Sequence, residues 1–351
     1  MYSRKALAWL LAVVSVALVL GVARADDKPS IIRVSFPGVG VGNRPVVGGN
    51  PFNLLQLRGT LEDEFKPDGV PVKWTFLRGA GPAVNELFAN NLDDVSLLGD
   101  LPSIVGRSGG LKTRILASAG KVNLYVVVPT DSPVKDIKDL RGKRFGVFKG
   151  TCLQLSANRI FEANGFAEKD VRAVNMDTAT LKAALITKDI DGGIGTSDII
   201  ALRDQGAVRI IYQTKGDPRF TCNSTILASE DFVKRYPSYT KRIVRDYVLA
   251  AKWITDHQSD LGEAYRLWAK SGTPFSNFKE DWSGESIRDK ASPLLDPYII
   301  ARYRKNITDA KRYGLIRNTF EFEPWVDSSF LTQVLKEEKL EGEWRVQPAL
   351  D

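Results

Sequence analysis

From residue 31 to residue 222 the chain alternates between short apolar runs and longer amphipathic runs, and this alternation restricts the possible folds most. Runs such as IIRVSF (31–36) are rich in β-branched residues and predict strands, whereas PFNLLQLRGTLEDEF (51–65) predicts a helix. Strands that alternate with helices build a mostly parallel sheet covered by helices, so we expect an α/β fold. Further strands are predicted at 72–77, 94–99, 113–118, 123–129, 144–150, 171–176, 191–195 and 208–214, and further helices at 81–91, from 102, at 151–165, 180–188 and 196–206.

From Ser229 onward the sequence predicts almost only helices. Apolar residues recur at helical spacing between 239 and 254, which indicates a face that packs on a core. The simplest partner for these helices is the first α/β unit. We therefore expect a discontinuous first lobe (26–122 and 225–351), a second lobe (123–224) and a ligand cleft between them.

The first 25 residues have the features of a secretory signal peptide. Arg4 and Lys5 precede an apolar run (6–22), and the small-x-small motif 23–25 predicts cleavage after Ala25. The alternative is a membrane anchor, because the run is at the lower edge of a spanning length. Cleavage of this segment would remove three cations and lower the formal net charge from +7 to +4. The remaining Lys and Arg residues are scattered along the sequence, which argues against a nucleic-acid partner.

The chain has two cysteines, Cys152 and Cys222, and one histidine, His257. In an exported protein the two cysteines either form a disulfide or remain separate, buried thiols, and the sequence leaves both alternatives open. A single histidine without a Cys-x-x-Cys motif does not make a usual zinc site, so we expect no metal. His257 ends a predicted helix, where a dipole interaction or a surface position is expected rather than catalysis.

The stretch GDLPSIVGRSGG (99–110) contains the spacing of a hydrolase nucleophile, with Ser108 between Gly106 and Gly110. A nucleophile elbow needs a strand before the serine and a helix after it. Here a helix precedes Ser108 and a strand (113–118) follows, so we assign Ser108 to a turn. A Gly-rich run (38–49) likewise lacks the third glycine of a dinucleotide motif, and we expect it to form a flexible wall of the cleft.

Five strand-to-helix turns carry the functional signal of this sequence. Ligands of open α/β sheets bind outside the carboxyl ends of strands, and free amides at helix N-termini bind anions. A hydroxyl or carboxylate at a helix start is otherwise only a cap. The binding hypothesis therefore depends on the turns meeting in one place. They are 36–52, 77–83, 98–103, 148–154 and 194–200.

Several segments resemble periplasmic solute-binding proteins of ABC importers, in the group that binds sulfonates, taurine, nitrate and thiamine-precursor pyrimidines. The resemblance rests on WTFLRGAGPAVNELFANN and its continuation (74–118), on IKDLRGKRFGVFKGTCLQL and its continuation (137–166), and on 184–200, 307–316 and 326–340. It implies a two-lobed type II periplasmic-binding-protein fold whose C-terminal helices pack on the first lobe. The chain departs from the group at the long loop 38–50, at 196–200 and at Cys152, so the ligand stays open.

This resemblance implies an extracytoplasmic binding component rather than an enzyme. It would hold a small organic anion in the cleft, close about hinges near 119–124 and 222–227, and deliver the anion to an inner-membrane permease, as a periplasmic monomer without cofactor. Nitrate or a pyrimidine is the alternative ligand, and an enzyme with Cys152 as its nucleophile is the alternative function. The expected ligand-binding residues are Arg78, Gly81 and Asp100 from the first lobe and Thr151, Cys152, Thr196, Ser197 and Asp198 from the second.

Overall fold

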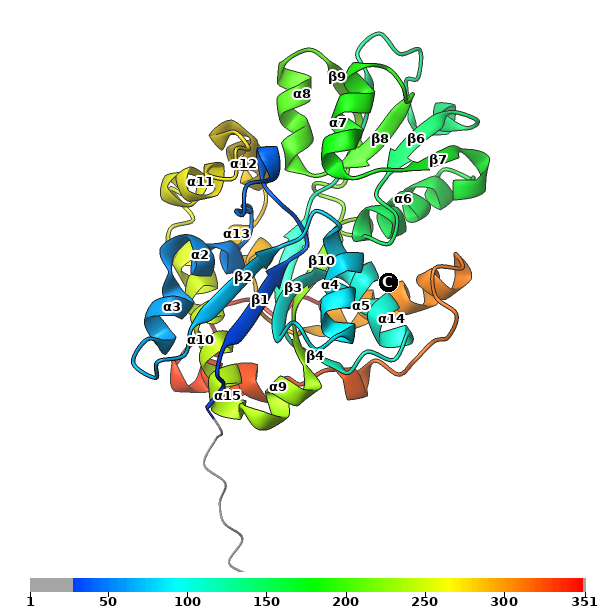
Figure 1. Ribbon diagram of the computed structural model, residues 1–351. Coiled ribbons are helices and arrows are strands. Elements are labelled where there is room, and N and C mark those ends of the chain that lie inside the picture. The colour runs from blue at the N-terminus through cyan, green and yellow to red at the C-terminus, as the bar shows by residue number, and fades with distance from the viewer. Residues whose placement is uncertain (1–27, 350–351) are drawn as a thin grey trace, which may run out of the picture.

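Two five-stranded sheets organise the computed structural model, which describes residues 28–349 (Figure 1). The predicted signal peptide lies outside these residues. The first sheet has the order β2-β1-β3-β10-β4, formed by β1 (Ile32–Phe36), β2 (Val72–Phe76), β3 (Val95–Gly99), β4 (Thr113–Val122) and β10 (Cys222–Ser229). The second has the order β7-β6-β8-β5-β9, formed by β5 (Tyr125–Pro129), β6 (Arg144–Val147), β7 (Arg172–Asn175), β8 (Gly192–Gly195) and β9 (Val208–Gln213). The expected α/β fold is confirmed.

Both sheets are mostly parallel, as expected, but each contains one strand that runs against the other four. β1 is parallel to β2 and β3, and β6 is parallel to β7 and β8. In contrast, β10 is antiparallel to β3 and β4, and β5 is antiparallel to β8 and β9. Both antiparallel strands enter their sheet directly from the other sheet, without the helical crossover that a parallel neighbour requires.

β10 was not predicted, and it changes where the lobes divide. The whole strand lies in the first sheet, between β3 and β4. The expected boundary at 224/225 falls inside it, so we propose that the second lobe ends before Cys222. The chain then passes between the sheets after β4 and before β10.

Helices cover both faces of the first sheet, and the C-terminal helices pack there as expected (Figure 1). One face is covered by α2 (Pro51–Arg58), α3 (Thr60–Phe65), α10 (Pro237–Asp256) and α15 (Ser329–Glu337), and the other by α4 (Ala80–Ala89), α5 (Asp100–Ser108) and α14 (Pro297–Arg312). α11 (Gly262–Ala269) and α12 (Phe275–Trp282) extend the first lobe beside α2, and α9 (Glu230–Arg235) and α13 (Ile287–Lys290) are short connections. The second sheet carries α6 (Cys152–Ala163), α7 (Thr178–Ile186), the 3₁₀ helix η4 (Ser197–Ile199) and α8 (Ile200–Asp204). No helix within residues 28–349 is long and apolar enough to cross a membrane.

Helix starts differ from the prediction at several places. The helix expected over 51–65 is divided at Gly59, whose φ of 69° is left-handed. α7 begins at Thr178 rather than Thr180, because the Asp177 side chain caps it by accepting a hydrogen bond from the Thr180 amide at 2.8 Å. α5 begins at Asp100 rather than Pro102, and Ser197 follows the N-cap of η4 instead of serving as the cap. Thr151 caps α6 as predicted.

Asp246 of α10 gives a pH-dependent prediction. Burial raises the pKa of this carboxyl to about 6, although Arg245, at 2.8 Å, acts to lower it. The folded pKa exceeds the unfolded value, so the folded state loses stability as the pH rises from about 4 to about 6. Asp246→Asn removes this loss. We expect the stability of the variant relative to the wild type to rise by up to about 3 kcal/mol across that interval, because one pKa unit corresponds to about 1.4 kcal/mol. Urea unfolding of both proteins at several pH values measures this change. A difference in stability that does not depend on pH contradicts a raised pKa of Asp246.

A candidate anion-binding cleft between the lobes

Residues of both lobes line an inner cavity of about 270 Å³. All five predicted turns contribute to it, and the start of α7 adds a sixth. The turn 36–52 contributes Gly38 and Gly48–Asn50, the turn 77–83 contributes Ala80 and Gly81, and the turn 98–103 contributes Gly99 and Pro102. The turn 148–154 contributes Phe148 and Thr151–Leu153, the turn 194–200 contributes Thr196 and Ser197, and α7 contributes Thr178. The expectation that the turns meet at one shared hollow is confirmed.

An outer cavity of about 390 Å³ continues the inner one. Val47, Gly48, Thr178, Thr196 and Ser197 line both. The outer cavity adds the loop 39–43 and several charged side chains, which are Arg78, Asp177, Lys182 and Asp198. The two cavities therefore form one cleft with a less charged interior and a charged entrance.

Five helices of eight or more residues start at the inner cavity. They are α2, α4, α5, α6 and α7, represented in its lining by Asn50, Gly81, Gly99, Cys152 and Thr178. The first amides of a helix have no partner inside the helix, and its dipole places partial positive charge there. Convergence of five such ends makes the interior suited to an anion.

Gly81 is required by packing at the start of α4. A Cβ atom at this position would lie 2.4 Å from Cβ of Pro102 at the start of α5. The glycine therefore lets two helix starts approach each other beside the cavity. Gly81 lines the inner cavity, and its expected contact with a ligand stays a prediction.

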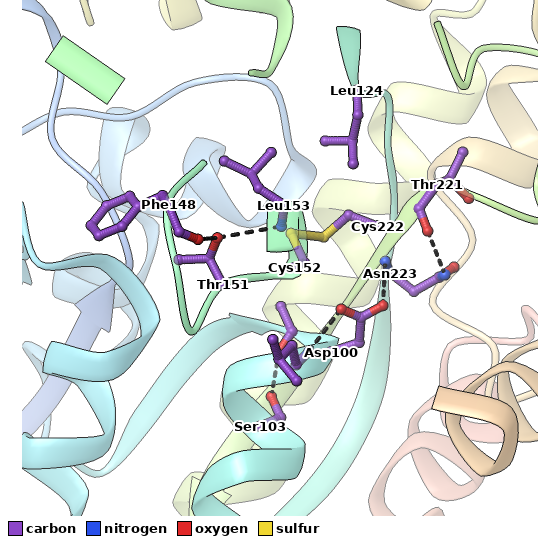
Figure 2. Close-up of a disulfide and its surroundings, with 12 residues drawn as sticks. Asp100, Ser103, Leu124, Phe148, Thr151, Cys152, Leu153, Thr221, Cys222 and Asn223 are labelled. Carbon is purple, nitrogen blue, oxygen red and sulfur yellow. Dashed lines mark hydrogen bonds between the residues drawn. A yellow bond between two sulfur atoms is a disulfide. The ribbon is translucent and has the colours of Figure 1, made fainter. Parts of the chain in front are cut away.

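A disulfide joins Cys152 to Cys222, with 5.6 Å between their Cα atoms. This decides between the two alternatives left open by the sequence. Figure 2 shows the bond linking the start of α6 to the start of β10, and both cysteines line the inner cavity. Neither thiol is free, so a Cys152 thiolate nucleophile has no support in this structure.

The Thr151 hydroxyl holds the turn before α6. Its Oγ1 donates to the Phe148 carbonyl at 2.7 Å and accepts from the Leu153 amide at 3.3 Å (Figure 2). Both bonds are internal to the turn, so the side chain positions the α6 amides. Thr196 likewise donates to Asp198 Oδ1 at 2.9 Å and fixes the turn before η4.

Two of the expected ligand-binding residues lie at the entrance and are already paired. Arg78 Nε donates to Asp177 Oδ2 at 2.6 Å, which joins the first lobe to the start of α7 in the second. Asp198 Oδ2 lies 2.8 Å from Lys182 Nζ. Neither residue lines the inner cavity. Arg78 therefore bridges the lobes here instead of presenting a free guanidinium.

Asp100 does not line either part of the cleft, which corrects its expected ligand contact. It is 1% exposed and lies below the disulfide in Figure 2. Its carboxylate accepts hydrogen bonds from the amides of Leu101 and Asn223 and from Asn306 Nδ2 at 2.8 Å. Burial raises its pKa, against the opposing effect of Arg159 and Arg302. Asp100 positions β10 and α14 beneath the cavity.

The hydrolase motif is structural, as the sequence analysis concluded. Ser108 ends α5, and its Oγ donates to the Asn318 carbonyl at 2.7 Å. His257 follows α10, stacks on Trp253 and contacts the Trp253 carbonyl through Nδ1 at 2.8 Å. The two residues have separate structural partners.

The Gly-rich loop lines the cleft as expected, but neighbouring residues hold it in place. The Val41 amide donates to the Ser271 carbonyl at 2.8 Å. A Cβ atom on Gly40 would lie 2.4 Å from the Ser271 oxygen, and one on Gly48 would lie 2.5 Å from the Trp268 Cβ. The glycines therefore allow the loop to lie against the α11–α12 region.

Sequence reasoning missed several polar residues of the inner cavity, notably Asn50, Asn53, Asn123, Ser224 and Asp281. Asn50 carried a readable signal, because an asparagine before Pro51 is a typical N-cap and its side chain accepts from the Phe52 amide. Asn123 and Asp281 gave none, since only the tertiary fold brings the start of β5 beside α12.

A larger hollow of about 890 Å³ shares no lining residue with the cleft. Its lining contains charged side chains that are paired with each other, such as Lys149 with Glu168 at 3.2 Å and Arg312 with Glu162. Of the helix starts at the inner cavity, only that of α6 contributes to this hollow, through Lys149 before the helix and Gln154 in its first turn. We therefore assign the candidate site to the cleft.

Comparison with known proteins agrees with this geometry. The family model described as NMT1/THI5 like matches residues 65–260. A protein of Bacillus subtilis described as an aliphatic sulfonates-binding protein is 22% identical over 219 residues, which span 62% of this chain and 65% of that relative's length. A solved structure described as the periplasmic sulfonate-binding protein SsuA of a sulfonate ABC transporter from Methylobacillus flagellatus is 29% identical. It has a TM-score of 0.77 and covers 93% of this chain and 99% of its own.

The same fold also occurs in an enzyme. The structure of the desulfurization enzyme DSZB is 18% identical, with a TM-score of 0.64, and covers 88% of this chain and 100% of its own. This likeness concerns the fold alone. Function must therefore be argued from the residues of the cleft.

Proposed function

The chain belongs to the NMT1/THI5-like family, and from this premise we propose that it is the substrate-binding component of an ABC importer. In this role it captures a small organic anion of sulfonate or taurine type between its lobes and delivers it to an inner-membrane permease. It acts in the periplasm as an exported monomer and needs no cofactor. The sulfonate-binding descriptions of its relatives support the ligand class.

One observation carries the proposal, namely the convergence of five helix starts from both lobes on the inner cavity. Backbone amides at the helix starts can donate hydrogen bonds to a bound anion in place of the water molecules that it loses. They do so without a flexible, positively charged side chain. Closure of the lobes excludes water, which strengthens each of these contacts. Arg78 and Asp177 meet across the entrance and would be separated when the lobes part.

A binding role also fits the chemistry of the cleft better than an enzymatic one. Covalent catalysis needs an activated nucleophile, and the candidate thiol is held in the disulfide. Nitrate and pyrimidines remain alternative ligands on the same scaffold, and the test below includes them.

A thermal-shift titration tests the function. Ethanesulfonate, taurine, nitrate, acetate and a pyrimidine are added separately, and we expect the melting temperature to rise with the sulfonate concentration. Binding to the native state at 100 times Kd adds about 2.7 kcal/mol. Thr151→Val/Ser197→Val should raise the Kd at least tenfold, because it disturbs two second-lobe turns that line the cavity.

Thr187→Val is the matched control, since Thr187 ends α7 at the opposite end from the cavity. It should leave the Kd unchanged. A melting temperature that no sulfonate raises contradicts the sulfonate class, and a response to nitrate or the pyrimidine alone assigns the alternative ligand.

A further inference from the structure

One buried polar atom at the inner cavity has no partner among the described residues. Asn123, at the passage from β4 to β5, is 1% exposed and lines the cavity. Its Nδ2 donates to the Glu285 carboxylate at 2.7 Å and to the Asp281 carbonyl at 3.2 Å. Its Oδ1 accepts no hydrogen bond. The two acceptors fix the orientation of the amide, because turning it over would place Oδ1 against both of them.

An unpaired buried acceptor lowers the stability of the folded state. Such a group loses the hydration that it has in the unfolded chain and gains no donor in its place. A donor on a bound ligand would remove that loss at Asn123. The same argument favours a ligand with an O–H or N–H group over an otherwise equal ligand without one.

The charged groups around Asn123 are paired with one another at this end of the cavity. Lys290 Nζ lies 3.0 Å from both Asp281 Oδ2 and Glu285 Oε2. Tyr125 also donates to Asp281 Oδ1 at 2.7 Å. Lys121, a second cation near this end, donates to Gln347 at 2.7 Å and lies over the Tyr298 ring. These two ammonium groups balance the two carboxylates, so the preference for a donor rests on Oδ1 of Asn123.

This end lies close to the helix starts that suit an anion. Val122, the neighbour of Asn123, pairs with Cys222, whose disulfide partner Cys152 begins α6. The disulfide Cα atoms are 5.6 Å apart, and paired strand residues are separated by about 5 Å. Asn123 and the start of α6 therefore lie in the lining of the same cavity, where one ligand can contact both.

We propose that Asn123 is a specificity-determining residue that accepts a hydrogen bond from the far end of the ligand. The preferred ligand is then a short organic acid with a hydroxyl or amino group opposite its acidic group. This inference rests on the proposed function, since it assumes that the acidic group binds at the helix starts.

Isothermal titration calorimetry with three matched probes tests the inference. Ethanesulfonate has no distal donor, 2-hydroxyethanesulfonate has a hydroxyl and 2-aminoethanesulfonate has an amine. We expect the wild type to bind at least one donor-bearing probe about tenfold more tightly than ethanesulfonate, as one satisfied hydrogen bond implies. Asn123→Leu, of similar volume, should remove this preference, so that the three probes bind the variant with nearly equal affinity.

Asn158→Leu is the matched control. Asn158 is also buried, 4% exposed, and also has an unpaired Oδ1, but it lies on α6 outside the cleft. It should retain the preference. Equal wild-type affinities for all three probes overturn the role of Asn123 even if the variant fails to fold, as does an equal loss for all three in a folded variant. Absence of binding by every probe instead refutes the proposed function, and the inference falls with it.

Discussion

Removal of the disulfide should lower the free energy of unfolding by about 4 kcal/mol, in Cys152→Ala/Cys222→Ala compared with the oxidised wild type. The bond joins residues 70 positions apart, and the chain-entropy model assigns about 4 kcal/mol to a loop of this length. The closed loop contains α6 to β9, most of the second lobe. Its loss therefore enlarges the unfolded ensemble of that lobe. Urea unfolding monitored by circular dichroism measures the difference.

A reductant provides the control for this prediction. Reduction of the wild type should reproduce most of the loss, whereas the double variant should not respond to it. A loss below about 1 kcal/mol would contradict the entropic account, because reduction would then hardly change the unfolded state. Since Cys152 also begins α6 at the cavity, the reduced protein should bind the sulfonate probes more weakly.

Most strands could be predicted from the sequence because they are short runs rich in apolar and β-branched residues. The strand β10 does not have this composition throughout. Polar residues fill its first half, yet Asn223, Ser224 and Thr225 are buried. Asp100 accepts from the Asn223 amide, and the hydroxyls of Tyr298 and Tyr303 contact Asn223 and Thr225 at 3.2 Å. The partners that make this strand possible come from α5 and α14. No local pattern around 222–229 contains that information.

The candidate site likewise has one part that could be predicted from the sequence and one that could not. Its main-chain part was predictable, because glycines and caps mark helix starts locally. The charged residues were not, since Arg78 and Asp100 look available in a turn until their partners are known. Arg78 meets Asp177, 99 positions away, and Asp100 meets Asn306, 206 positions away. Pairing across such separations is a property of the fold.

The buried ion pair between the lobes gives the other large expected effect. Arg159 Nε of α6 lies 2.9 Å from Asp309 Oδ2 of α14, and the two side chains are 4% and 2% exposed. Asp309→Ala should lower the free energy of unfolding by about 3–5 kcal/mol, because it leaves a buried guanidinium without its carboxylate. Arg159→Met should cost less, since Asp309 Oδ1 keeps Arg312 at 2.9 Å.

The double variant Arg159→Met/Asp309→Leu should recover most of the stability lost in Asp309→Ala, because apolar residues of similar size often replace a buried pair at little cost. Urea unfolding of the wild type, Arg159→Met, Asp309→Leu and the double variant closes the cycle, and strictly additive losses contradict it. The guanidinium nitrogens Nη1 and Nη2 of Arg159 have no partner among the described residues, so the pair is poorly compensated as a source of stability. If it instead orients α6 against α14, the double variant should be stable but bind the sulfonate probes more weakly, because α6 begins at the cavity.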